Sequence, residues 1–174
     1  MTIVTMADHE PFMRAALAVA AQGLARGELP IGAVVVLDGA VIAAAHTAER
    51  AEQRLLVHAE LLALEAADRL QLFPGNRRAA TLYTTCEPCL MCMGAAMSCF
   101  LGTVVYAVEA PSDGATALVQ RWRRPLEAFP AYRTPQIIGG VLRAAAIALF
   151  REYVTHHPPG SGVWDWAQQM AALA

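Results

Sequence analysis

The stretch Thr84-Thr85-Cys86-Glu87-Pro88-Cys89-Leu90-Met91-Cys92 places three of the chain's four cysteines within seven positions. A second short motif, His58-Ala59-Glu60, precedes it by roughly the length of one supersecondary unit. Cysteine sulfur and histidine nitrogen are common ligands of Zn²⁺ in proteins. We expect the two motifs to form one zinc site that the rest of the chain supports.

Pro88 indicates which of the three cysteines bind the ion. Proline is favoured at the first position of a helix, so a helix that begins at Pro88 places Cys89 and Cys92 on one face of its first turn. The positive end of the helix dipole lowers the pKa of both thiols there. Cys86 then ends the preceding strand, and we expect it to pack in the interior. Redox and structural motifs share this spacing, and a buried pair of small apolar residues is the alternative.

His58 and Glu60 are two positions apart, so they point in different directions from a helix. If the ion lies near the helix start, His58 binds it and Glu60 reaches an adjacent substrate pocket. The remaining histidines, which have no matching context, are His9, His46, His156 and His157. The ligand set His58, Cys89 and Cys92 leaves one coordination position open, which is typical of catalytic zinc.

An open position holds a water molecule whose pKa the metal lowers. Glu60 would take a proton from that water and pass it to the departing group. The backbone N–H of Cys89, at a helix start, would stabilise the tetrahedral intermediate. Histidine, a nearby glutamate and Pro-Cys-x-x-Cys around one ion are the signature of zinc-dependent nucleobase deaminases. We therefore expect a hydrolytic deaminase, and the alternative is a non-catalytic, zinc-stabilised interaction module.

The composition limits the possible partners and locations. The chain has 174 residues, 56% of them apolar and 16% charged, with a formal net charge of −2. This charge gives no overall bias towards nucleic acid, and no apolar run reaches the length of a membrane span. Residues 1–10 lack the basic region of a secretory signal. We expect a cytoplasmic protein with reduced or metal-bound cysteines, and the low charge predicts an oligomer that covers apolar surface.

The hydrophobic pattern predicts one domain over residues 1–174, with a core of about 8–155 and a tail over 156–174 that holds a short helix. Two apolar runs, 31–37 and 40–43, flank Asp38-Gly39, which is typical of a β-hairpin. Further strands are expected over 80–85, 104–108 and 136–141. A first helix is expected after a cap at Asp8, and further helices are expected over 57–70, 88–100, 143–154 and 164–173. We also expect a short helix over 115–122 and a loop over 46–56. This order predicts a mixed sheet with helices on both faces.

The chain resembles the cytidine deaminase-like superfamily, in the branch that holds bacterial tRNA adenosine deaminases and small guanine deaminases. The resemblance covers roughly residues 10–155. It implies a three-layer α/β/α fold around a five-stranded mixed sheet, one zinc per subunit and a homodimer. The stretches that carry it are 12–17, 27–34, His58-Ala59-Glu60 with Leu61 to Leu64, Glu87 to Cys92, Gly94-Ala95, Gly139 to Leu142 and the helix that follows.

The resemblance also implies four substrate-binding positions, Thr47, Ala59, Glu109 and Asp113. Thr47 stands where the tRNA enzymes carry an asparagine that contacts the base. Glu109 lies where RNA phosphates would approach, which disfavours RNA, and Asp113 loosely matches an aspartate of guanine deaminases. Arg54 to Val57 also replaces the usual Asp-Pro-Thr-Ala before the zinc histidine.

These departures favour a free nucleobase or nucleoside as substrate, with the wobble adenosine of tRNA as the alternative. Arg121-Trp122-Arg123-Arg124 is the one basic stretch with an aromatic residue. It either follows a nucleic-acid backbone or forms a solvated loop with Trp122 at a subunit interface. We expect the loops over 46–56 and 109–132 to select the ring that is deaminated.

Overall fold

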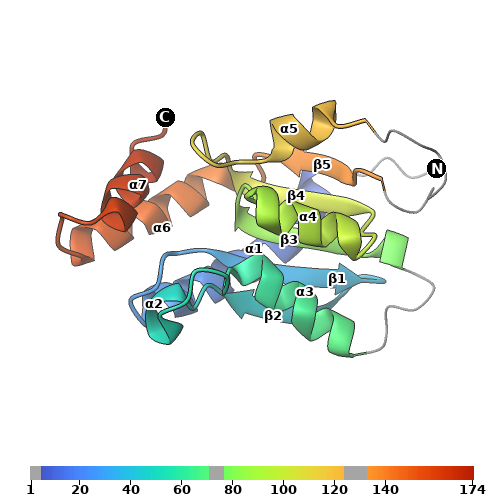
Figure 1. The fold of residues 1–174 in the computed structure, drawn as a ribbon, viewed down its shortest axis with the longest axis horizontal. Helices are drawn as coiled ribbons and strands as arrows, with labels where there is room; N and C mark the ends of the chain where they lie inside the picture. The colour runs from blue at the N-terminus through green and yellow to red at the C-terminus, as the bar shows by residue number, and fades with distance from the viewer. Residues whose placement is uncertain (1–4, 71–76, 124–132) are drawn as a thin grey trace.

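A computed structural model describes residues 5–70, 77–123 and 133–174, and these form a five-stranded sheet covered by helices on both faces (Figure 1). The strands are ordered β2-β1-β3-β4-β5. β1 (Gly32–Leu37) pairs antiparallel with β2 (Ala40–His46) and β3 (Thr81–Cys86). β4 (Thr103–Val108) and β5 (Gln136–Gly139) continue the sheet in parallel. The predicted α/β fold class with a mixed sheet is confirmed.

The β1–β2 hairpin closes through the two residues that the sequence analysis identified. Asp38 and Gly39 both have positive φ, 49° and 78°. A two-residue turn with both φ angles positive matches the right-handed twist of the strands on either side. β2 extends to His46 and is longer than the predicted run over 40–43.

The side chains of β1 alternate between two hydrophobic clusters, one on each face of the sheet. Ala33 and Val35 belong to the cluster that contains α3 and α4, whereas Val34 and Val36 belong to the one that contains α1 and α6. The strand is therefore apolar throughout, as expected for a strand covered on both faces.

Two pairs of helices make the outer layers (Figure 1). α3 (Ala59–Arg69) and α4 (Leu90–Ser98) cover one face, and α1 (Met6–Leu24) and α6 (Arg143–His156) cover the other. α7 (Gly162–Ala171) packs beside α6 at one end of the molecule. The short helices in the connections are α2 (Glu49–Glu52), η1 (Arg77–Ala79) and α5 (Thr116–Arg121).

Two expectations about the elements need correction. Thr5, not Asp8, is the N-cap of α1, and the carboxylate of Asp8 accepts the Thr5 N–H at 2.7 Å. The stretch expected as a loop over 46–56 contains α2, which is too short to show a periodic pattern. In the basic stretch, Arg121 ends α5, and Arg124 lies outside the described residues.

Gly32 allows α1 to lie close against β1. A Cβ at this position would lie 2.4 Å from the Ala20 backbone nitrogen and 2.5 Å from the Ala16 carbonyl oxygen. We predict that Gly32→Ala lowers the free energy of unfolding by about 1–3 kcal/mol, because neither backbone atom can give way cheaply. Urea denaturation measures the change. Gly162→Ala is the matched control, since a Cβ there meets nothing within 4 Å; equal stability of both variants would contradict the prediction.

Candidate metal centre and active site

The metal-binding motifs meet at the N-termini of two helices. His58 is the N-cap of α3 and Cys89 is the N-cap of α4, each with extended backbone dihedrals. The expectation that Pro88 begins the helix is therefore wrong by two positions. The reason is a contact with the neighbouring loop: Cys89 pairs with Gly114 in an isolated β-bridge, and the Pro88 carbonyl accepts the Ala115 N–H at 3.0 Å. These contacts hold Pro88 and Cys89 extended, and the helix starts after them.

The spacing of the three candidate ligands fits a zinc ion. Nδ1 of His58 lies 3.7 Å from Sγ of Cys89 and 3.5 Å from Sγ of Cys92. Tetrahedral zinc with ordinary Zn–N and Zn–S bond lengths separates such atoms by roughly 3.5 Å. The three ligand atoms all lie within 4.8 Å of one another, and they make the only such group of His, Cys, Asp and Glu within 5–70, 77–123 and 133–174. Cys86 is not among them.

The electrostatics of the three side chains already resemble those of a ligand set. Hydrogen bonds from Cys92 and His58 lower the pKa of the Cys89 thiol to about 4. The bond to Cys89 in turn raises the pKa of His58 to about 9. The Cys92 thiol donates a hydrogen bond to Cys89, and this bond raises the pKa of Cys92 well above the ordinary range. Without a metal, Cys89 is thus a thiolate that accepts hydrogen bonds from the His58 imidazolium and the Cys92 thiol. A bound cation would replace one proton on His58 and one on Cys92.

Glu60 lies in the first turn of α3, with only 3% of its surface exposed. Oε1 accepts the Thr84 hydroxyl at 3.1 Å, and Oε2 lies 3.5 Å from Sγ of Cys92. Burial raises the pKa of the Glu60 carboxyl. A carboxyl that is buried, oriented and raised in pKa suits both removal and donation of a proton near neutral pH.

Cys86 ends β3 and is buried, as the sequence analysis expects. Burial raises the pKa of its thiol well above the usual value. A neutral buried thiol behaves as a small hydrophobic side chain.

A small cavity of about 30 Å³ lies beside the candidate ligands. It has room for a water molecule or two, whereas sites for small organic molecules measure about 300–1,000 Å³. A nucleobase therefore enters only if part of the wall moves. The wall consists of Ile31, Thr47, Glu49, His58, Ala59, Glu60, Cys86, Glu87, Cys89, Asp113 and Trp166.

Trp166 of α7 brings the C-terminal helix to this cavity. Its Nε1 lies 3.1 Å from both Oγ of Ser112 and Oδ1 of Asp113, and its ring packs edge-on against Phe150 at a centroid distance of 5.5 Å. These contacts join α7 to the loop that follows β4. The helix expected in the C-terminal tail is thus a wall of the site.

Three of the four expected substrate-binding residues line the cavity, namely Thr47, Ala59 and Asp113. Glu109 is not part of the cavity wall. Its carboxylate forms a two-point ion pair with the guanidinium of Arg143, with Nε at 2.8 Å from Oε2. This ion pair lowers the pKa of Glu109. Because its charge is matched within the protein, Glu109 is a weaker argument against RNA than the sequence suggested.

Sequence reasoning missed Glu49, Glu87 and Trp166 as wall residues. Glu87 lies inside the cysteine motif, and its carboxylate accepts the N–H groups of Ala110 and Thr116, each at 3.0 Å. A carboxylate that binds two backbone N–H groups fixes the loop between β4 and α5. Trp166 follows His58 by more than one hundred positions, and no local pattern links the two.

Comparison with known proteins identifies the family. The model of the cytidine and deoxycytidylate deaminase zinc-binding region matches residues 6–108, which include both motifs. The chain belongs to this deaminase family. The family establishes a hydrolytic C–N deaminase with a zinc-binding region, so the alternative of a non-catalytic zinc module is wrong.

Relatives of this deaminase include proteins named for different substrates. A tRNA-specific adenosine deaminase of Bacillus subtilis is 34% identical over 151 residues, which cover 84% of this chain and 91% of that protein. A structure from a study of tRNA:A34 deaminases and wobble-position editing matches with a TM-score of 0.66 and 31% identity, covering 80% of this chain and 98% of the other. A guanine deaminase from Nitrosomonas europaea matches with a TM-score of 0.65 and 28% identity over 83% of each chain.

Within the three described segments, no helix combines the length and the apolar character needed to cross a bilayer.

We predict that Glu60→Gln in this deaminase lowers kcat by about 10²–10⁴-fold, because the amide cannot exchange protons. Zinc content measured by atomic absorption should stay at the wild-type level, since Glu60 is not in the proposed ligand set. Loss of zinc together with activity would contradict the role given to Glu60.

We predict that zinc binding at pH 7 releases about two protons, one from His58 and one from Cys92. His58 has a raised pKa of about 9 and is protonated at pH 7, whereas Cys89, at about 4, is already a thiolate. Zinc affinity should therefore rise with pH, steeply up to about 9 while both protons are displaced and less steeply above it, where only the Cys92 proton remains. Titration calorimetry in buffers of different ionisation enthalpy counts the protons. Cys99→Ser is the control and should change nothing; an affinity independent of pH between 6 and 9 would contradict the prediction.

Proposed function

We propose that this protein is a zinc-dependent hydrolytic deaminase that acts on adenosine in tRNA. The observation that supports this substrate is the similarity to the tRNA-specific adenosine deaminase of B. subtilis, of which this chain covers 91% at 34% identity. The geometry that supports the reaction is the group His58, Cys89 and Cys92 beside the buried Glu60. The departures from the tRNA enzymes at Thr47 and Glu109 favour a free base, whereas the relatives better support the alternative, adenosine in tRNA.

The residues divide the chemistry among them. His58, Cys89 and Cys92 hold the metal, which when bound supplies a water of lowered pKa. Glu60, oriented by the Thr84 hydroxyl, accepts a proton at Oε1 or Oε2 and donates it to the leaving amine. The Cys89 N–H, at the N-terminus of α4, is a donor for the negative charge that develops on the substrate. Thr47, Ala59 and Asp113 contact the base.

Deamination of a free purine is the second candidate, and Trp166 is the observation that favours it. Its indole lines the cavity beside the metal ligands and ties α7 to the loop at Ser112 and Asp113. A wall at this edge shields a small bound substrate from water, whereas an RNA loop needs more space beside α7. The match to the guanine deaminase of N. europaea supports this candidate as well.

Ammonia release from matched substrates separates the two candidates. We expect the zinc-loaded protein to deaminate an adenosine at the wobble position of a tRNA anticodon stem-loop. The panel also contains guanine, adenine, cytosine, their nucleosides and a stem-loop with guanosine at that position. Turnover of free guanine without turnover of the adenosine stem-loop would overturn the proposed substrate.

We predict that Trp166→Phe raises kcat/KM for the stem-loop by about 2–10-fold. Phenylalanine keeps the ring packing against Phe150 but removes the N–H that ties α7 to Ser112 and Asp113, a hydrogen bond of about 0.5–1.5 kcal/mol. Steady-state kinetics on the stem-loop and on a free purine measure the effect, which should be absent for the purine.

Trp164→Phe is the matched control for this prediction. Trp164 lies on the same helix, but its Nε1 donates to the His157 carbonyl at 3.0 Å, away from the metal ligands. Equal stem-loop kinetics for both variants would show that the indole of Trp166 is no barrier to RNA.

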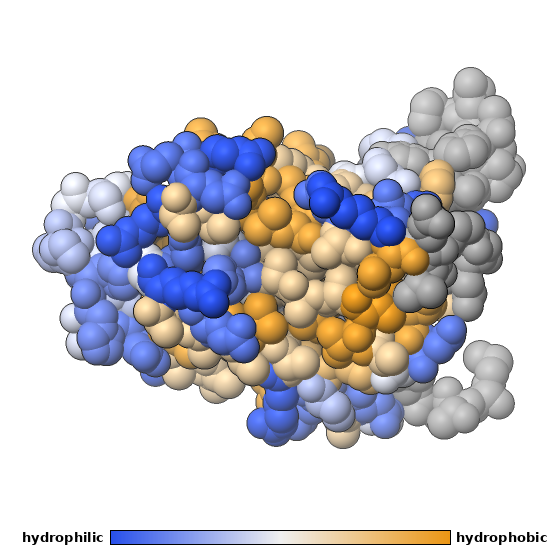
Figure 2. All heavy atoms as spheres, turned by 90° about the horizontal axis from the view of Figure 1, so that it is seen from below, coloured by the Kyte–Doolittle hydropathy of each residue, from blue (hydrophilic) through white to orange (hydrophobic). Residues whose placement is uncertain are grey.

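A homodimer and a cytoplasmic location complete the proposal. Leu90, Leu118 and Trp122 line an exposed apolar groove along α4 and α5, and Val41 lies on the edge strand β2. Figure 2 shows apolar surface between hydrophilic residues on the face seen from below. Apolar area of this kind is typical of subunit contacts. Light scattering should give twice the mass of the chain, and a monomer would overturn the dimer.

A further inference from the structure

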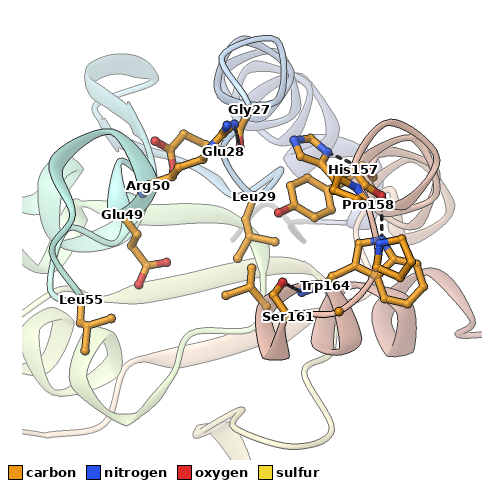
Figure 3. A pocket seen from close by; sticks show the side chains of 14 residues that line it. Gly27, Glu28, Leu29, Glu49, Arg50, Leu55, His157, Pro158, Ser161 and Trp164 are labelled. Carbon is orange, nitrogen blue, oxygen red and sulfur yellow. Dashed lines mark hydrogen bonds between the residues drawn. The ribbon is translucent and has the colours of Figure 1, made fainter.

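Glu49 is the only residue that lines both the metal cavity and a larger groove beside it, among the described residues. The groove measures about 500 Å³ and lies between α2 and the α6–α7 connection. In Figure 3 the Glu49 carboxylate extends from α2 towards the space that Leu29 and Ser161 border on the other sides. Glu49 is thus placed at the boundary between the metal ligands and the surface.

The carboxylate faces the side of the His58 ring that points away from the sulfur atoms. Oε1 of Glu49 lies 3.5 Å from Nε2 of His58, and the two side chains are 29% and 30% exposed. Nδ1 of the same ring faces Sγ of Cys89 and Cys92. One nitrogen therefore points to the metal position and the other to a carboxylate.

Buried contacts hold Glu49 in this position. The Glu28 carboxylate, only 2% exposed, accepts the N–H groups of Arg50 at 3.0 Å and Ala51 at 2.8 Å, which caps the start of α2. The Thr47 hydroxyl lies 3.4 Å from Oε2 of Glu49. These contacts distinguish Glu49 from Glu52 on the same helix, whose carboxylate pairs with exposed Arg54 instead.

We propose that Glu49 is a positioning residue for the metal ligand His58. Its carboxylate accepts the Nε2–H of the imidazole, which fixes the ring orientation and leaves Nδ1 free of its proton to bind the metal. A carboxylate behind a ligating histidine also raises the basicity of the ring, and loss of such partners typically weakens metal binding by about 10–100-fold. The inference rests on the ligand set of the proposed function and goes beyond it, since the family motifs do not include Glu49.

Zinc dissociation constants of the purified protein, measured by competition with a chromophoric chelator, test this assignment. Glu49→Ala should weaken zinc binding by about 10–100-fold. Glu49→Gln should lose less, because its amide oxygen still accepts the Nε2–H. Glu52→Ala, on the same helix, should bind zinc like the wild type. Circular dichroism of the zinc-free variants confirms that each has folded.

The tautomer of His58 shows whether Glu49 acts on the imidazole ring itself. A residue that only stabilised the fold would leave this tautomer unchanged. Long-range ¹H–¹⁵N spectra of the zinc-loaded protein should show a protonated Nε2, with a proton that exchanges faster in Glu49→Ala than in Glu49→Gln. Equal zinc affinity in Glu49→Ala and the wild type, or equal losses in Glu49→Ala and Glu49→Gln, would overturn the inference. A wild-type protein that binds no zinc would instead overturn the ligand set itself.

Discussion

The convergence of two helix N-termini at one point is the constraint on which the site depends. α3 begins after His58 and α4 after Cys89, so the first backbone N–H groups of both helices, which have no partner within the helix, lie near the candidate ligands. The positive ends of helices favour a thiolate, and Cys89 is one, whereas the hydrogen bond to Cys89 raises the pKa of Cys92, so the expectation of a lowered pKa holds for only one of the two thiols. The same field suits the negative charge of a tetrahedral intermediate. Sheet and helix layers serve mainly to bring these two chain segments together.

Three carboxylates hold the walls around this point. Glu87 binds backbone N–H groups of the loop after β4, and Glu28 binds those at the start of α2. Glu109 pairs with Arg143, which also donates to the carbonyl of Ala174 at the C-terminus. Each contact joins segments more than twenty residues apart. The cavity thus has a floor made by the two motifs and a wall to which Trp166 of α7 contributes.

The sequence predicts the sheet and the grouping of His58, Cys89 and Cys92 because both have local signals. The Asp38-Gly39 turn, the apolar strands and the cysteine spacing each follow from a few adjacent residues. The helix start at Pro88 was wrong because a bridge from Cys89 to Gly114 overrides the local preference of proline. Glu49 and Trp166 had no signal, since one lies in a four-residue helix and the other reaches the site only through packing of α7.

The most direct test of the account is the coordination of the zinc itself. X-ray absorption at the zinc edge of the loaded protein should show two sulfur ligands at about 2.3 Å, one imidazole nitrogen at about 2.0–2.1 Å and one light atom from solvent. That result means that His58, Cys89 and Cys92 bind the metal and leave one position for the reaction. A shell of three or four sulfurs, with no solvent ligand, would bring in Cys86 or Cys99 and would contradict the account.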